Sequence, residues 1–347
     1  MTKSEKNQSR NALYGRVVKS TFSPPWWAKN RHIQTIFPRF LQKRRKLNVK
    51  HQQLALPDGD FLDISWGEKP ENQKGMVVLF HGLEGSVRSH YANDMMAVLR
   101  TRGFWPVLMH FRGCSGRANT LPRAYHSGET EDALFFLEWL NKQYPNIKKS
   151  AIGFSLGANM LLKLLGENPM QRFVESAVAV SPPLRLRECA DSINQGFSRV
   201  YQRYLLNSMV ANLARKMQKV DFGNTLKLLP NELKKLKSFR DFDEHVTAPL
   251  HGFSSANDYY ARCSGIQFLR QILTPTLVLH AKDDPFMNEH VIPAPADLSS
   301  AVRYELSEQG GHVGFMHGTP WRPTIWMHER VATFFESQLD ISVKHAV

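Results

Sequence analysis

The stretch Ser150-Ala-Ile-Gly-Phe-Ser-Leu-Gly-Ala-Asn159 decides the fold. Its first half has the apolar character of a buried strand, and its second half runs into an apolar, helix-like segment. Between them, Gly153-Phe-Ser-Leu-Gly157 matches the G-x-S-x-G pattern of a nucleophile elbow, in which a serine is held exposed on a sharp turn from a strand into a helix. The two glycines leave room for close backbone approach. Ser155 is therefore the candidate nucleophile.

Buried-type strands alternate with helix-like segments along most of the chain. The polar turn Pro57-Asp-Gly-Asp60 separates the first two predicted strands, Val49–Leu56 and Phe61–Trp66. Further strands are predicted at Met76–Phe80, Trp105–His110, Ser150–Phe154, Ser176–Val180, Thr276–His280 and Val302–Leu306, and helices at Tyr91–Arg102, Glu129–Gln143, Leu156–Leu165 and Thr324–Ser337. Continuous apolar strands that alternate with helices indicate an α/β fold, with a mostly parallel sheet flanked by helices on both faces.

The alternation stops between Ser181-Pro-Pro183 and about Pro249, where the chain is helical, basic and poor in strands. This predicts a helical lid insertion over about residues 184–248. Residues 1–45 are predicted to form an N-terminal arm, and residues 46–347 one α/β domain. Six lid residues either line an apolar acyl pocket or form the core of the helices: Phe197, Tyr201, Tyr204, Leu205, Leu206 and Met209.

A nucleophilic serine needs a base that takes its proton and a carboxylate that orients the base. Asp284 follows the predicted strand Thr276–His280, and His312 lies in a glycine-rich loop after Val302–Leu306. The carboxyl ends of parallel strands meet at one edge of a sheet, so we expect both side chains there. Asp283 is the competing acid, because spacing does not distinguish adjacent loop residues; Asp284 is preferred.

Two backbone amides are predicted to form the oxyanion hole. One is that of Leu156, which directly follows the nucleophile, and the other is that of Leu83, in the loop Phe80-His-Gly-Leu-Glu-Gly-Ser86 after an earlier strand. The alternative interpretation of this loop is a flexible strand-to-helix turn. It is not a phosphate-binding P-loop, because the lysine and the following Ser or Thr are missing.

The chain of 347 residues carries a formal net charge of +14, which favours contact with anionic partners. The charge is concentrated in Arg39–Lys50, which contains Lys43-Arg44-Arg45-Lys46, and in Leu226–Arg240. These stretches are interpreted either as solvated basic faces or as weak contacts with an anionic membrane surface. Nucleic-acid binding is not predicted, because zinc-finger spacing and RNP-like aromatic strings are absent from the sequence.

No metal, cofactor or disulfide is predicted. The three cysteines are widely scattered: Cys114, Cys189 and Cys263. Asp58, Asp60 and Asp63 do not form an EF-hand loop, because Lys69 stands where the bidentate glutamate belongs, so they are interpreted as a turn. The N-terminus lacks the apolar region of a signal peptide, and a cytoplasmic location is expected. The sequence makes no prediction of oligomeric state.

Several motifs together resemble one known family. They are Asn30-Arg-His-Ile-Gln-Thr35, His81-Gly-Leu-Glu-Gly-Ser86, Phe111-Arg-Gly-Cys-Ser-Gly116, Gly153-Phe-Ser-Leu-Gly-Ala-Asn159, Asp284-Pro285 and Gly311-His312. The combination resembles the YheT-like hydrolases of the α/β-hydrolase superfamily, which are related to the ABHD1, ABHD2 and ABHD3 lipases, and it covers nearly the whole chain. The eukaryotic relatives carry a membrane-anchoring segment near their start that this sequence lacks, so the bacterial branch is the closer match.

This resemblance implies an α/β-hydrolase fold and a serine hydrolase. Its substrates would be carboxylic esters, either short- to medium-chain acyl esters or lipid-like esters, cleaved through an acyl-enzyme by Ser155, Asp284 and His312. Two other classes stay open. One is a non-catalytic ligand receptor with the same fold, and the other is a peripheral lipid-binding protein.

Overall fold

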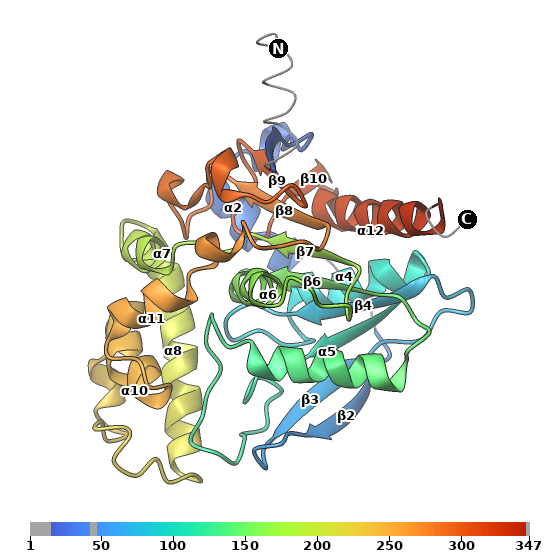
Figure 1. Ribbon diagram of the computed structural model, residues 1–347. Helices are drawn as coiled ribbons and strands as arrows, with labels where there is room; N and C mark the ends of the chain where they lie inside the picture. The colour runs from blue at the N-terminus through green and yellow to red at the C-terminus, as the bar shows by residue number, and fades with distance from the viewer. Residues whose placement is uncertain (1–14, 42–46, 345–347) are drawn as a thin grey trace, which may run out of the picture.

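A nine-stranded sheet forms the centre of the protein (Figure 1). The computed structural model describes residues 15–41 and 47–344. In the order β1-β9-β8-β7-β6-β4-β5-β3-β2, every neighbouring pair is parallel except the two pairs that involve β3. The strands are β1 (Arg16–Lys19), β2 (Lys50–Ala55), β3 (Phe61–Trp66), β4 (Gly75–Phe80), β5 (Phe104–Met109), β6 (Lys149–Phe154), β7 (Ser176–Val180), β8 (Thr276–Ala281) and β9 (Val302–Ser307). The predicted mostly parallel sheet is confirmed.

Four long helices cover the two faces of this sheet. They are α4 (His90–Thr101), α5 (Glu131–Gln143), α6 (Leu156–Glu167) and α12 (Trp326–Lys344). Side chains of α5 and α6 belong to one buried apolar cluster, and side chains of α4 and α12 belong to a second. This arrangement, with helices on both faces, is the one predicted for continuous apolar strands.

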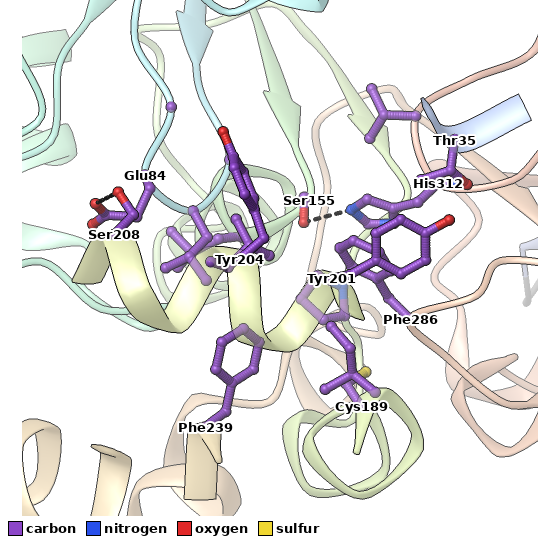
Figure 2. Close-up of a pocket in the computed structure, with 18 of the residues that line it drawn as sticks. Thr35, Glu84, Ser155, Cys189, Tyr201, Tyr204, Ser208, Phe239, Phe286 and His312 are labelled. Atoms are coloured by element: carbon purple, nitrogen blue, oxygen red, sulfur yellow. Dashed lines mark hydrogen bonds between the residues drawn. The ribbon is translucent and has the colours of Figure 1, made fainter. Parts of the chain in front are cut away.

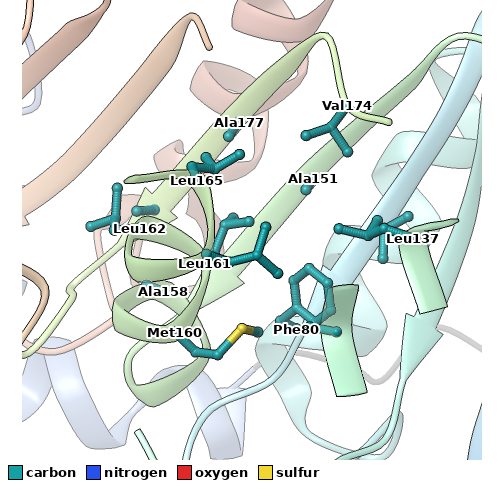
Figure 3. Close-up of a cluster of buried hydrophobic side chains, with 14 of the residues drawn as sticks. Phe80, Leu137, Ala151, Ala158, Met160, Leu161, Leu162, Leu165, Val174 and Ala177 are labelled. Atoms are coloured by element: carbon teal, nitrogen blue, oxygen red, sulfur yellow. The ribbon is translucent and has the colours of Figure 1, made fainter. Parts of the chain in front are cut away.

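The strand β4 shows why the sequence builds two cores. Its residues are all buried, and successive side chains point to opposite faces. Met76, Val78 and Phe80 therefore join the cluster with α5 and α6, whereas Val77 and Leu79 join the cluster with α4 and α12. Figure 3 shows part of the first cluster, in which apolar side chains of α6 lie against the sheet.

Three short strands lie outside the sequence-based predictions. β1 pairs in parallel with β9 at the edge of the sheet. β10 (Met316–Thr319) and β11 (Arg322–Ile325) form a separate antiparallel hairpin. Each of the three has four residues, which is too short for alternation of apolar and polar residues to be recognised. Because β11 occupies the predicted start of the last helix, α12 begins at Trp326.

A helical region separates β7 from β8. It contains α7 (Leu186–Ile193), α8 (Ser198–Met217), η2 (Leu233–Lys235), α9 (Phe239–Phe242), η3 (Asp243–Thr247), α10 (Ala248–Leu250), α11 (Ala256–Cys263) and η4 (Gly265–Phe268). Figure 1 shows α7, α8, α10 and α11 grouped at one side of the molecule. Leu206, Leu213 and Leu233 belong to an apolar cluster within this region. Its helices continue beyond residue 248, as far as Phe268.

The described part of the predicted N-terminal arm is tied to the body by a buried side chain. After β1 come η1 (Trp26–Ala28), α2 (Arg31–Ile36) and α3 (Pro38–Leu41). The Nε2 atom of Gln34 donates to the carbonyl oxygens of Ala28 (2.7 Å) and Met316 (3.2 Å), and its Oε1 atom accepts from the Met316 amide (2.6 Å). These bonds fix α2 beside the start of β10.

None of the helices within residues 15–41 and 47–344 is long and apolar enough to cross a membrane. The three cysteines are unpaired: Cys114, Cys189 and Cys263.

Acidification is expected to destabilise the fold. Burial lowers the pKa of five histidines, His81 to about 3, His110, His251 and His280 to about 4, and His126 well below its usual value. These groups stay neutral when folded but bind protons when unfolded, so their contribution to stability is present above pH 6.5 and is lost as the pH falls. Burial also raises the pKa of three carboxyl groups, which opposes this effect: Glu129, Asp243 and Asp283.

The histidines outnumber the carboxyl groups, so unfolding is expected to take up protons on balance between roughly pH 4 and 6. The free energy of unfolding should therefore fall as the pH is lowered through this range. Urea denaturation at a series of pH values measures this slope. Stability that is constant or rises on acidification would contradict the assignment.

Candidate active site

Ser155 lies in a strained turn between β6 and α6. Its backbone has φ 50° and ψ −117°, a positive φ that residues other than glycine rarely adopt. A Cβ atom on Gly153 would lie 2.4 Å from the carbonyl oxygen of Gly157, and one on Gly157 would lie 2.4 Å from that of His81. Both positions therefore require glycine, because α6 begins in direct contact with the ends of β6 and β4.

His312 lies between Ser155 and Asp284. Figure 2 shows its ring directed at Ser155, with Nε2 2.9 Å from the serine Oγ. On the other side of the ring, Nδ1 is 2.7 Å from Asp284 Oδ2. Asp284 is 1% exposed, and its Oδ1 accepts from the Phe286 amide at 2.9 Å. The structure thus brings together a serine, an imidazole and a buried carboxylate in the arrangement that activates a serine nucleophile.

The adjacent carboxyl group occupies a different place. Asp283 Oδ1 accepts from the amide of Gly311 at 2.9 Å. Burial raises the pKa of Asp283 to about 6. Of the two acids between which the sequence leaves a choice, Asp284 contacts the imidazole of His312, and Asp283 fixes the backbone of the loop that carries it.

Two contacts that the sequence did not predict hold the imidazole in place. The ring of Phe286 stacks on that of His312, with centroids 4.0 Å apart and planes at 16°. The backbone amide of His312 donates to Thr35 Oγ1 at 3.0 Å. Helix α2 therefore supports the loop that carries His312, although the two residues are 277 positions apart in the sequence. The quoted motif Asn30-Arg-His-Ile-Gln-Thr35 therefore lies against the candidate active site.

Thr35→Val is expected to lower kcat/KM roughly five- to tenfold. The change keeps the shape of the side chain but leaves the amide of His312 without its acceptor, a loss of about 1 kcal/mol. Thr35→Ser keeps the hydroxyl and should retain most of the activity. Steady-state kinetics on a soluble ester, with melting temperatures for both variants, measure the effect. Equal losses in the two variants would exclude the hydrogen bond as the cause.

The two residues whose amides are predicted to form an oxyanion hole, Leu83 and Leu156, line the same cavity as Ser155. Leu156 is the first residue of α6, where backbone amides have no acceptor within the helix. On the other loop, the backbone amides on either side of Leu83 already donate hydrogen bonds. The Gly82 amide donates to the Tyr91 hydroxyl (2.9 Å), and the Glu84 amide donates to the Tyr125 hydroxyl (2.8 Å). Among the described residues the Leu83 amide has no hydrogen-bond acceptor. Leu83, Leu156, Ser155 and His312 line one cavity.

Glu84 connects this loop to α8. Its carboxylate accepts from the Tyr125 hydroxyl at 2.9 Å, from Ser208 Oγ at 2.8 Å and from the side-chain amide of Asn212. Figure 2 shows the contact between Glu84 and Ser208. The residue next to Leu83 is thus bonded to the middle of the longest helix of the insertion.

The cavity has a volume of about 740 Å³ and lies between the sheet, α2, α3 and the helical insertion. Four of the six lid residues considered above line it: Tyr201, Tyr204, Leu205 and Met209. Leu206 instead packs in the apolar cluster of the insertion, and Phe197 is 53% exposed. Large side chains of α8 therefore form one wall opposite Ser155.

One group of residues within the described part of the chain has the composition of a metal site. Donor atoms of His126, Glu129 and His251 lie within 4.8 Å of one another. Glu129 already accepts from the guanidinium of Arg123 at 2.7 Å. The Nδ1 atom of His126 accepts from the Gly128 amide, which places the proton of the neutral ring on Nε2 and leaves that atom no lone pair for a metal. Two of the three donor residues, His126 and Glu129, are thus already engaged in hydrogen bonds within the protein, which disfavours a cation here.

The acidic turn between β2 and β3 is paired with an arginine of the protein itself. Asp58 and Asp60 lie 2.8 and 3.2 Å from the guanidinium of Arg112, which is buried. The protein's own arginine thus supplies the positive charge, in agreement with a turn rather than a calcium loop.

Comparison with known proteins places this fold and site in a family. Residues 75–319 match the family model of the alpha/beta hydrolase fold. The chain belongs to this family, and the predicted resemblance is confirmed.

The relatives and a solved structure agree with this placement. YheT of Escherichia coli, which is named as an esterase, is 45% identical over 321 residues, or 92% of this chain and 94% of YheT. The monoacylglycerol lipase of Saccharomyces cerevisiae is 30% identical over 273 residues, or 77% of this chain and 60% of the lipase. The esterase Pf2001 of Pyrococcus furiosus shares the fold, with a TM-score of 0.53, 15% identity and coverage of 93% of this chain and 98% of that one.

Proposed function

We propose that this α/β hydrolase is a serine esterase that cleaves carboxylic esters through Ser155, His312 and Asp284. The observation that carries the proposal is the continuous hydrogen-bond chain from Ser155 Oγ through His312 to the buried Asp284, at the wall of an apolar cavity. The esterase and lipase names of the relatives support the same class of reaction.

In this mechanism Ser155 Oγ attacks the ester carbonyl carbon while His312 Nε2 takes the serine proton. Asp284 holds Nδ1–H and stabilises the imidazolium. The amides of Leu83 and Leu156 donate to the oxyanion of the tetrahedral intermediate, and each such donor contributes ~10²–10³ in kcat. His312 then protonates the departing alcohol. Water then attacks the carbonyl carbon of the acyl-enzyme while His312 Nε2 takes one of its protons. As the bond to Ser155 Oγ breaks and the acid leaves, His312 returns this proton to Oγ.

The residues that surround the cavity support an ester with an apolar acyl group. We infer that the helices from α7 to α11 act as a lid, because α8 supplies one wall of the cavity. A cytoplasmic location and contact with an anionic membrane surface stay predictions at this point.

A fluorophosphonate probe tests the proposed reaction. The folded protein is expected to be labelled on the peptide that contains Ser155, as identified by mass spectrometry, and Ser155→Ala should not be labelled. If the folded protein is not labelled at all, the non-catalytic receptor becomes the better explanation.

The length of the acyl chain should control the rate. With p-nitrophenyl esters, kcat/KM is expected to rise about three- to fourfold for each added CH₂ group, since burial of one such group contributes ~0.8 kcal/mol. The rise should end when the 740 Å³ cavity is filled. A profile that is flat from acetate upward would show that the cavity does not bind the acyl group.

A further inference from the structure

Exposed apolar side chains surround the entrance of the cavity. Phe40 is 73% exposed, Tyr204 57% and Val200 56%, and all three also line the cavity. Phe197, 53% exposed, contacts the ring of His32 in α2, with centroids 4.6 Å apart. Contiguous apolar surface of this kind marks an interaction site rather than ordinary protein exterior.

The segments that supply α2, α3 and α8 to this entrance are basic and lack acidic residues. Residues 15–57 and 192–220, which supply α2, α3 and α8, contain no aspartate or glutamate. On α8, Arg199 and Arg203 are exposed and four residues apart, so they lie on one side of the helix. Arg203 is also three residues from Val200, which places the cations next to the apolar side chains.

Contacts across the entrance join its two sides into one surface. Arg39 of α3 donates to the Tyr204 hydroxyl of α8 at 2.8 Å, and its guanidinium lies over the tyrosine ring. Figure 2 shows Tyr201 and Tyr204 of α8 close to Ser155, so this surface opens toward the candidate nucleophile. We call the seven exposed residues around this entrance the mouth surface: Arg39, Phe40, Phe197, Arg199, Val200, Arg203 and Tyr204.

The second basic stretch of the sequence has a different character. In Leu226–Arg240 the leucines Leu226, Leu233 and Leu236 are buried in the cluster of the insertion, and none of its residues up to Ser238 lines the cavity. Leu229 is exposed, but neither it nor the neighbouring lysines line the cavity. The cluster Lys43-Arg44-Arg45-Lys46 lies outside the described residues.

We propose that the mouth surface docks on an anionic phospholipid bilayer. Its aromatic and aliphatic side chains would enter the boundary between headgroups and acyl chains while Arg39, Arg199 and Arg203 contact the anionic headgroups. A nucleic acid would satisfy the arginines but not the apolar rim, so the bilayer is the better complement. Delivery of a lipid-like ester from the bilayer to Ser155 rests on the proposed function, whereas docking itself does not.

Vesicle sedimentation tests docking. The full chain is expected to sediment with vesicles that contain phosphatidylglycerol, more weakly with vesicles of phosphatidylcholine alone, and less as salt is added. The double variant Arg199→Glu/Arg203→Glu should bind anionic vesicles at least about tenfold more weakly, since each cation near such a surface contributes to the binding free energy. Phe197→Ser should also weaken binding, which a purely electrostatic contact would not show. Lys234→Glu/Lys237→Glu is the matched control and should bind like the unchanged protein.

Absence of binding to anionic vesicles at low salt would overturn docking. Equal losses of vesicle binding in the Arg199/Arg203 and Lys234/Lys237 variants would also overturn it. So would binding of a DNA duplex that depends on the same arginines and is unaffected by Phe197→Ser. Melting temperatures show that each variant is folded. Hydrolysis of a soluble ester is measured in parallel: hydrolysis without vesicle binding overturns docking alone, and vesicle binding without hydrolysis overturns the proposed function alone.

Discussion

Ser155→Ala is expected to lower kcat for ester hydrolysis about 10⁵–10⁶-fold. Without the Oγ atom no acyl-enzyme can form, and His312 loses the group whose proton it takes. What remains is the smaller acceleration by substrate binding and by the two amide donors, which typically leaves ~10³–10⁴ over the reaction in water. Steady-state and single-turnover rates on a p-nitrophenyl ester measure the loss.

Folding of this variant is easily controlled. Alanine accepts the positive φ of position 155 about as well as serine does, so the melting temperature should change by no more than surface substitutions usually cause. A folded Ser155→Ala protein that hydrolyses the ester at more than a tenth of the original rate would remove Ser155 from the mechanism.

Asp284→Asn is expected to lower kcat roughly 10⁴-fold, because an amide favours the wrong tautomer of the histidine and cannot stabilise its charged form. The neighbouring change Asp283→Asn is the matched control. Asp283 accepts from the Gly311 amide, and an asparagine oxygen can accept the same bond, so less than a tenfold loss is expected.

The ratio of the two losses decides which carboxylate orients His312. Small losses in both Asp283→Asn and Asp284→Asn would mean that either acid can serve. A larger loss in Asp283→Asn would contradict the contact between Asp284 and His312.

The sheet and the meeting of three site residues follow from local sequence patterns. Ser155 directly follows β6, Asp284 and His312 lie in the loops after β8 and β9, and these parallel strands end at one edge of the sheet. Topology alone therefore predicts that the three side chains approach one another. It does not choose between Asp283 and Asp284, because that choice depends on the path of an irregular loop.

The contacts that support the site could not be predicted in this way. Thr35 and His312 are 277 positions apart, and their hydrogen bond depends on how α2 packs against the loop after β9. Phe286 stacks on His312 because of the same loop path that selects Asp284. Neither contact has a periodic pattern or a turn motif that would reveal it. The four-residue strands β1, β10 and β11 were missed for a related reason, since their pairing partners rather than their own residues define them.

The bonds from Glu84 to Ser208 and Asn212 link the entrance to the chemistry. Helix α8 cannot swing outward without releasing the carboxylate that sits one residue from Leu83. In the proposed mechanism, outward movement of α8 and movement of the Leu83 amide are therefore coupled through Glu84. By reciprocity, an oxyanion bound at the proposed Leu83 and Leu156 donors would favour the closed position of α8 to the same extent.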